Sequence, residues 1–186
     1  MLILGVDPGL KATGICVVEG TEVTDRALIT TSPEDGDEGQ RVQDIAGKAY
    51  LFIEGLGEGV SADNTILAIE AQHFEDVRGD HEEARRERAA KAASTIQVAH
   101  VAGALMEVAA RFGLQVVVVQ PKFAKRALTG NGNASKAQVR GMAARMAGVE
   151  ADEISEHEAD AVAVACGGQD VLKQRKLEKL KEAAET

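Results

Sequence analysis

The first thirty residues constrain the fold most, because they read as three successive β-strands. Residues 2–7, 14–18 and 22–30 are rich in Val, Ile, Leu and Thr, and turn residues separate them at Asp7-Pro8-Gly9 and at Glu19-Gly20. Connections this short cannot carry the crossover that parallel neighbours need. The chain is therefore expected to begin with an antiparallel meander.

Helical and strand patterns alternate in the rest of the chain. The expected helices are residues 40–55, about 83–112, 122–128, 136–146 behind a Ser135 cap, and 155 to at least 166, and the expected strands are the buried residues 65–70 and 116–119. The residues from 173 onward read as a mixed-charge helix or a frayed end. A meander followed by alternating helices and strands predicts an α/β fold with a sheet of mixed direction, and 186 residues suit a single domain.

Composition excludes several classes of protein. With 45% hydrophobic residues, 27% charged residues and 3 Pro, the chain is neither disordered nor collagen-like. No apolar run reaches the roughly 18–20 residues of a membrane span, and the start lacks the basic region of a secretory signal. We therefore expect a cytoplasmic protein without a membrane partner. Cys16 and Cys166 lack paired spacing, which favours buried thiols over a zinc site or a disulfide.

Charge is strongly segregated along the chain. A net charge of -9 argues against a polyanionic partner. Residues 108–149, however, contain no Asp or Glu and seven basic residues: Arg111, Lys122, Lys125, Arg126, Lys136, Arg140 and Arg145. This segregation indicates a basic docking face on an acidic protein. A solvated face without a partner is the alternative.

Four residues form a candidate metal site. Asp7 and Glu70 each end a hydrophobic strand, where we expect exposed carboxylates that meet if both strands are central in the sheet. His157 and Asp160 are three residues apart and share one face of the first turn of the last helix. Three carboxylates and one imidazole suit Mg²⁺ or Mn²⁺ better than zinc. Two such ions could activate a water and stabilise the leaving oxygen of a phosphodiester.

Each of these residues also has a structural interpretation. Asp7 could form a turn through its side chain, and Glu70 could be an ordinary strand-end charge. His157 and Asp160 occupy the start of a helix, where the helix dipole favours acidic residues.

Four motifs occur in the order known from one family. They are Gly5-Val6-Asp7-Pro8-Gly9-Leu10 with Thr13-Gly14; Ala68-Ile69-Glu70; Thr129-Gly130-Asn131-Gly132 with Ser135-Lys136 and Gln138-Val139; and His157-Glu158-Ala159-Asp160-Ala161. Over about residues 1–166 the chain thereby resembles the RuvC family of Holliday junction resolvases. The resemblance implies an RNase H-like fold, with residues 1–168 as the nuclease domain and 169–186 as a charged helical tail. It also implies a homodimer that nicks four-way DNA junctions in symmetric pairs.

The resemblance assigns roles to residues. Asp7, Glu70, His157 and Asp160 match the family's catalytic, metal-binding set, which implies two Mg²⁺ ions per active site, with Mn²⁺ able to substitute. Lys125 and Lys136 match positions that hold DNA phosphates. Three neighbouring basic residues join them as DNA-binding candidates: Lys122, Arg126 and Arg140. A branch-migration partner would fit such an enzyme.

The segment after Glu70 is longer than the family usually has. His73 and Phe74 are candidates there for the wedge that opens the junction centre, although Phe74 could equally pack beneath the loop. With one Tyr and no Trp, base stacking cannot dominate DNA binding, so we expect phosphate contacts and an affinity that falls steeply with salt.

Other functions are also compatible with these sequence features. The long segment after Glu70 favours a broader nuclease for forks and flaps, and a junction-binding protein that does not cut is a further alternative. An actin-like ATPase would need a much longer chain. The second half of the long helix, residues 96–108, is apolar enough that we expect it to be buried. Its small residues (Ala99, Ala102, Gly103 and Ala104) could pack against a second copy or form ordinary core.

Overall fold

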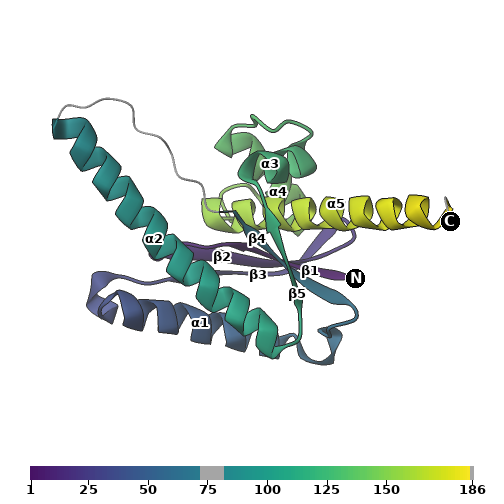
Figure 1. Ribbon diagram of the computed structural model, residues 1–186, viewed down its shortest axis with the longest axis horizontal. Helices are drawn as coiled ribbons and strands as arrows, with labels where there is room; N and C mark the ends of the chain where they lie inside the picture. Colours follow the sequence, from purple (N-terminus) through teal and green to yellow (C-terminus); the bar gives the residue numbers. More distant parts are fainter. Residues whose placement is uncertain (72–81, 185–186) are drawn as a thin grey trace.

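A mixed β-sheet carries the fold, with helices on both of its faces (Figure 1). The computed structural model describes residues 1–71 and 82–184. Within these residues the strands form one sheet of five in the order β3-β2-β1-β4-β5. None of the helices in these two ranges combines the length and the apolar character that crossing a bilayer would demand.

The strands run as the sequence predicts. β1 (Leu2–Asp7), β2 (Ala12–Glu19) and β3 (Glu22–Thr30) form the antiparallel meander. β4 (Thr65–Glu70) pairs with β1 in parallel, and β5 (Gln115–Val119) pairs with β4 in parallel. β1 is therefore central, with an antiparallel neighbour on one side and a parallel neighbour on the other. The expected sheet of mixed direction is confirmed.

The helices begin where the capping residues indicate. They are α1 (Glu38–Gly55), α2 (Glu82–Arg111), α3 (Pro121–Thr129), α4 (Lys136–Ala147) and α5 (Glu156–Ala184), and short 3-10 turns cover Pro33–Asp35 and Gly57–Gly59. Ser135 caps α4 by accepting a hydrogen bond from the Gln138 backbone N–H. α5 continues through the charged tail as one helix, which extends away from the sheet in Figure 1.

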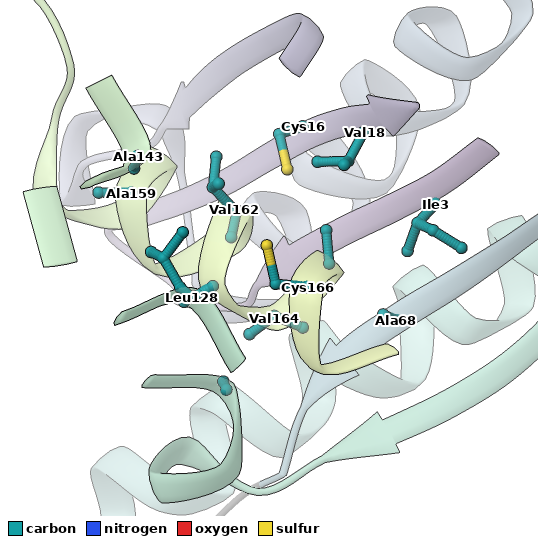
Figure 2. Close-up of a cluster of buried hydrophobic side chains, with 14 of the residues drawn as sticks. Ile3, Cys16, Val18, Ala68, Leu128, Ala143, Ala159, Val162, Val164 and Cys166 are labelled. Carbon is teal, nitrogen blue, oxygen red and sulfur yellow. The ribbon is translucent and has the colours of Figure 1, made fainter. Parts of the chain in front are cut away.

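The sheet separates two hydrophobic cores. α1 and α2 cover one face, where Ile45, Ile53 and Leu105 are fully buried. α3, α4 and α5 cover the other face, where the buried thiols of Cys16 and Cys166 lie among Val162 and its neighbours (Figure 2). The expectation of two buried thiols is confirmed.

Two glycines let α5 lie directly on the central strands. A Cβ atom at Gly5 of β1 would collide with the carbonyl oxygen of Ala161, and one at Gly14 of β2 would collide with that of His157. Because both positions lack a side chain, the helix backbone contacts the strand backbone. The first turn of α5 is thereby placed against the strands β1 and β2.

Two burial predictions are wrong. β5 was expected to be fully buried, yet Val118 is 54% exposed while Val117 and Val119 are each 1% exposed. The neighbouring helices therefore cover one face of this edge strand more completely than the other. The apolar half of the long helix was expected to be buried from Ile96 onward, yet Ile96 itself is 51% exposed. Burial in α2 is confined to a stripe that includes Val101 and Leu105.

Candidate active site

Asp7 and Glu70 end two neighbouring parallel strands. Val6 of β1 is paired with Ile69 of β4, so the two acids follow at the same edge of the sheet. The sequence prediction that these carboxylates meet is confirmed by this register.

The first turn of α5 brings His157 to the same place. Its Nδ1 atom lies 2.7 Å from Oδ2 of Asp7. α5 also covers Asp7, whose exposure is only 8%. The expectation that Asp7 is exposed at the sheet edge is therefore wrong, because the helix packs over the end of β1.

Three carboxylates share this partly buried space. Burial, the negative charges of Asp7 and Asp160, and a hydrogen bond with Asp7 raise the pKa of Glu70 from 4.5 to about 8. Burial and the charge of Asp7 likewise raise the pKa of Asp160. The raised pKa values mean that burial and neighbouring negative charge disfavour ionisation of these carboxyls, and that the protein's own cations compensate only in part. A cation entering the site would therefore be stabilised.

His157 has two competing roles. Its hydrogen bond to Asp7 and the charges of Asp7 and Asp160 raise the pKa of the imidazole, although burial opposes this. The charged imidazole is a partner for Asp7, whereas only the neutral imidazole is a metal ligand. Binding a metal through His157 would therefore release a proton.

The donor set fits a hard divalent cation by its chemistry. Carboxylate oxygens are the ligands that Mg²⁺ and Mn²⁺ prefer. In the part of the chain that the structure describes, no three acidic, imidazole or thiol side chains are already grouped around one point as ligands. The side chains of Asp7, Glu70, His157 and Asp160 would thus have to adjust to close around an ion.

Basic side chains surround the acidic cluster. The charge of Lys125 opposes the rise in the pKa values of Glu70 and Asp160, and that of Lys136 opposes it at Asp160 as well. Lys122 and Lys125 line a cavity of about 660 Å³ between α2 and α3, together with Lys91, Ser94, Thr95, Gln120 and Pro121. Lys91, Ser94 and Thr95 were missed by the sequence analysis, because nothing local in α2 indicates that it faces α3.

The remaining DNA-binding candidates are distributed nearby. The guanidinium of Arg126 lies over the ring of Phe123, with 5.1 Å between its Cζ atom and the ring centre. Lys136 Nζ lies 2.5 Å from Oε2 of Glu156, whose pKa is lowered by Lys136 and, to a smaller extent, by Arg140. His73 and Phe74 lie outside the described residues.

Arg111 does not belong to this basic group. It ends α2 at one end of β5, whereas α3 begins at the other end of that strand. Arg111 instead lines a groove between α1 and α2. The seven basic residues of the segment 108–149 therefore do not form one continuous face.

A buried ion pair beside the site was also missed. Nη1 of Arg26 in β3 lies 2.6 Å from Oε1 of Glu158, which follows His157 in α5. Although burial acts to raise it, the pKa of Glu158 is lowered because Ser155 and Arg26 donate hydrogen bonds to the carboxylate. The capping pattern of Ser155 and Glu158 was visible in the sequence, but the distant Arg26 was not.

Comparisons with known proteins agree on one family. A family model described as "Crossover junction endodeoxyribonuclease RuvC" matches residues 87–167, which include His157 and Asp160. A protein of that name from Nocardia farcinica is 33% identical over 169 residues, which cover 89% of this chain and 79% of the relative. Another from Synechococcus sp. (strain WH7803) is 32% identical over 172 residues, covering 90% of this chain and 97% of the relative.

A solved structure shares the fold. The structure titled "T. thermophilus RuvC in complex with Holliday junction substrate" matches with a TM-score of 0.67 and 27% identity. The match covers 90% of this chain and 92% of that one. The similarity therefore extends over most of both chains.

Proposed function

This chain belongs to the RuvC family of crossover junction endodeoxyribonucleases, and we propose that it resolves four-way DNA junctions by paired, symmetric, metal-dependent nicks. Its sheet and helices have the RNase H-like arrangement of the RuvC structures. The observation that carries the proposal is the meeting of the ends of β1 and β4 with the first turn of α5. That meeting supports the assignment of Asp7, Glu70, His157 and Asp160 as metal ligands, and the charges of Lys125 and Lys136 act on this cluster.

The acidic cluster would hold two Mg²⁺ ions, for which Mn²⁺ would substitute. Asp7, Glu70, His157 and Asp160 would hold these ions. When bound, such ions lower the pKa of a water molecule and stabilise the leaving oxygen of a phosphodiester.

The protein's own groups supply position and charge. Lys125 lies close enough to the cluster for its charge to oppose the rise in the pKa values of Glu70 and Asp160, so it would hold the scissile phosphate against the negative charge of the carboxylates. The packing of α5 over Asp7 excludes solvent from the end of β1. Hydrolysis breaks the bond between phosphorus and the 3′ oxygen, and it leaves a 5′-phosphate and a 3′-hydroxyl.

DNA phosphates would be bound along α3 and the start of α4. Lys122, Lys125 and Arg126 lie on α3, while Lys136 and Arg140 lie on α4. Contacts of this kind position a backbone without reading its sequence. His73 and Phe74 are proposed, from the resemblance alone, to open the junction centre.

Paired nicks require two active sites, so we infer a homodimer. The groove between α1 and α2, of about 1000 Å³, offers a surface for a second copy. Leu51 lines this groove and is 63% exposed. Residues 1–168 would form the nuclease domain and 169–186 a charged helical tail. The enzyme would act in the cytoplasm, with a branch-migration partner as a further expectation.

A cleavage assay with three substrates tests the proposed function. An immobile four-way junction, a fork and a matched duplex are incubated with and without Mg²⁺, and Asp7→Asn serves as the control. The proposal predicts metal-dependent cutting of the junction alone. Equal cutting of the fork would favour a broader branched-DNA nuclease, and binding without cutting under any divalent ion would favour a junction-binding protein.

A further inference from the structure

Glu158 lies between the two α5 residues of the acidic cluster, yet it points away from solvent. Glu158 is only 7% exposed, although it lies in the first turn of a helix, where side chains commonly reach solvent. Both of its carboxylate oxygens accept hydrogen bonds: Oε1 from Nη1 of Arg26 at 2.6 Å and Oε2 from the backbone N–H of Ser155 at 2.9 Å. One side chain thus links the start of α5 to the sheet.

The link to Ser155 is reciprocal. The Ser155 hydroxyl oxygen accepts a hydrogen bond from the Glu158 backbone N–H at 3.2 Å. This pair forms a capping box, which fixes the conformation of the first helical turn. His157 lies within that turn, and Asp160 follows it directly.

Arg26 provides the attachment on the sheet. It lies in β3 opposite Cys16 of β2, and Gly14 of the same strand β2 contacts the backbone of His157. The first turn of α5 is therefore held at two separate points, one through backbone packing and one through an ion pair. These two contacts add to the packing of Ala161 against Gly5 and to the contact of His157 with Asp7. The ion pair ties the start of α5 to the outer strand β3.

The acidic side chains near the start of α5 give this restraint a role. Asp7 and Glu70 end neighbouring strands and Asp160 lies in the helix above them, and like charges held close repel one another. Exposed ion pairs are weak restraints. In this pair, however, the side chain of Glu158 is only 9% exposed and that of Arg26 only 26%, so the interaction is poorly screened by solvent.

We propose that Arg26 is a positioning residue: through Glu158 it holds the first turn of α5 so that His157 and Asp160 face Asp7. The inference rests on the proposed function only in taking these residues as metal ligands. Arg26 itself contacts neither metal nor DNA in this account. Its loss should therefore affect metal binding and turnover more than junction affinity.

The test compares Arg26→Met, Arg26→Lys and the double variant Arg26→Met/Glu158→Gln with the native full-length chain. Mn²⁺ binding is measured by calorimetry without DNA, and kcat and KM are measured on a four-way junction. Arg26→Met should weaken Mn²⁺ binding and lower kcat by about 10-fold, as is usual for groups that orient metal ligands. KM should stay within about twofold, because the phosphate-binding lysines are on other elements. Arg26→Lys keeps the positive charge and one donor nitrogen, so Mn²⁺ binding and kcat should both recover most of what Arg26→Met loses.

The double variant separates positioning from folding. It leaves no unpaired buried carboxylate, so its melting temperature should lie close to the native value while its Mn²⁺ affinity stays reduced. Lys173→Met, which breaks an exposed ion pair with Asp170 in the middle of α5, is the matched control and should change neither readout. If folded Arg26→Met and the double variant bind Mn²⁺ and turn over as the native chain does, the inference is overturned.

The two proposals can fail separately. If the native chain binds Mn²⁺ but cuts no junction, and Arg26→Met still weakens Mn²⁺ binding, the positioning role stands and the proposed function fails. If the native chain cuts junctions and the Arg26 variants match it in both readouts, the function stands and the positioning role fails.

Discussion

Nδ1 of His157 lies 2.7 Å from Oδ2 of Asp7, across 150 positions of sequence. This contact joins the end of the central strand β1 to the first turn of α5. The hydrogen bond also raises the pKa of His157, so the imidazole holds its proton more tightly than a free imidazole does. The same two residues are proposed as metal ligands, which makes proton release part of metal binding.

Replacing Asp7 by Asn should abolish cutting without loss of junction binding. The amide keeps the shape of the side chain but removes a negative charge near the DNA phosphates. We expect cleavage to fall by about 10³-fold or more, as for other central catalytic groups. Gel-shift titration should show equal or tighter binding of a four-way junction. A folded variant that no longer binds the junction would mean that Asp7 has a structural role.

Metal affinity should rise with pH between about 6 and 9. Glu70, whose pKa is about 8, and His157, whose pKa is raised, must both lose protons before they can act as ligands. Calorimetry of Mn²⁺ binding in buffers of different ionisation enthalpy counts the protons released. We expect release at pH 7 that diminishes toward pH 9. Binding with no proton release at pH 7 would contradict the assigned ligands.

Glu70→Gln should stabilise the metal-free protein at pH 8. Between 4.5 and about 8 the unfolded chain binds fewer protons at Glu70 than the folded chain does, so folding stability falls as pH rises through this window. Because glutamine does not titrate, Glu70→Gln removes that loss of stability. A gain of about 1 kcal/mol or more in the free energy of unfolding would raise the melting temperature by about 2–4 °C for a chain of this size.

The comparison at a second pH makes the Glu70 test specific. Near pH 4.5 the advantage of Glu70→Gln should be small, and saturating Mn²⁺ at pH 8 should reverse the order by stabilising only the native chain. Glu58→Gln, at an exposed position, is the control. If the Glu70→Gln variant melts below the native chain at pH 8 without metal, the raised pKa of Glu70 is contradicted.

Much of the site could be predicted from local sequence patterns. Asp7 and Glu70 were predicted because each ends a strand, and strand ends are visible in the hydrophobic pattern. His157 and Asp160 were predicted because their spacing places them on one helical face. The strand bounds of β1, β3 and β4 agree with the prediction residue by residue.

Contacts between distant segments could not be predicted in this way. The burial of Asp7 depends on how closely α5 lies on Gly5 and Gly14, which no periodicity reveals. The ion pair of Arg26 and Glu158 spans 132 positions. The exposure of Val118 depends on how completely the helices cover each face of the edge strand β5, which its apolar composition does not reveal.

Glu156→Gln should tighten junction binding. Glu156 holds Lys136 Nζ at 2.5 Å and thus competes with DNA phosphate for that ammonium group. Both side chains are largely exposed, so the pair is weak and the gain should be about two- to fivefold. Affinity is measured at several salt concentrations. Glu178→Gln, which removes one negative charge from the distal part of α5, is the control; an equal gain there would assign the effect to net charge alone.

Mapping the cut positions on all four strands of a junction tests whether the chain makes paired, symmetric, metal-dependent nicks. Each strand is labelled in turn at its 5′ end, and products formed with Mg²⁺ are resolved on a denaturing gel and then treated with ligase. The account predicts cuts at symmetric positions on two opposite strands, ligatable because they carry a 5′-phosphate and a 3′-hydroxyl, and absent with Asp7→Asn. Cuts on a single strand, cuts that persist without metal, or cuts that Asp7→Asn still makes would contradict it.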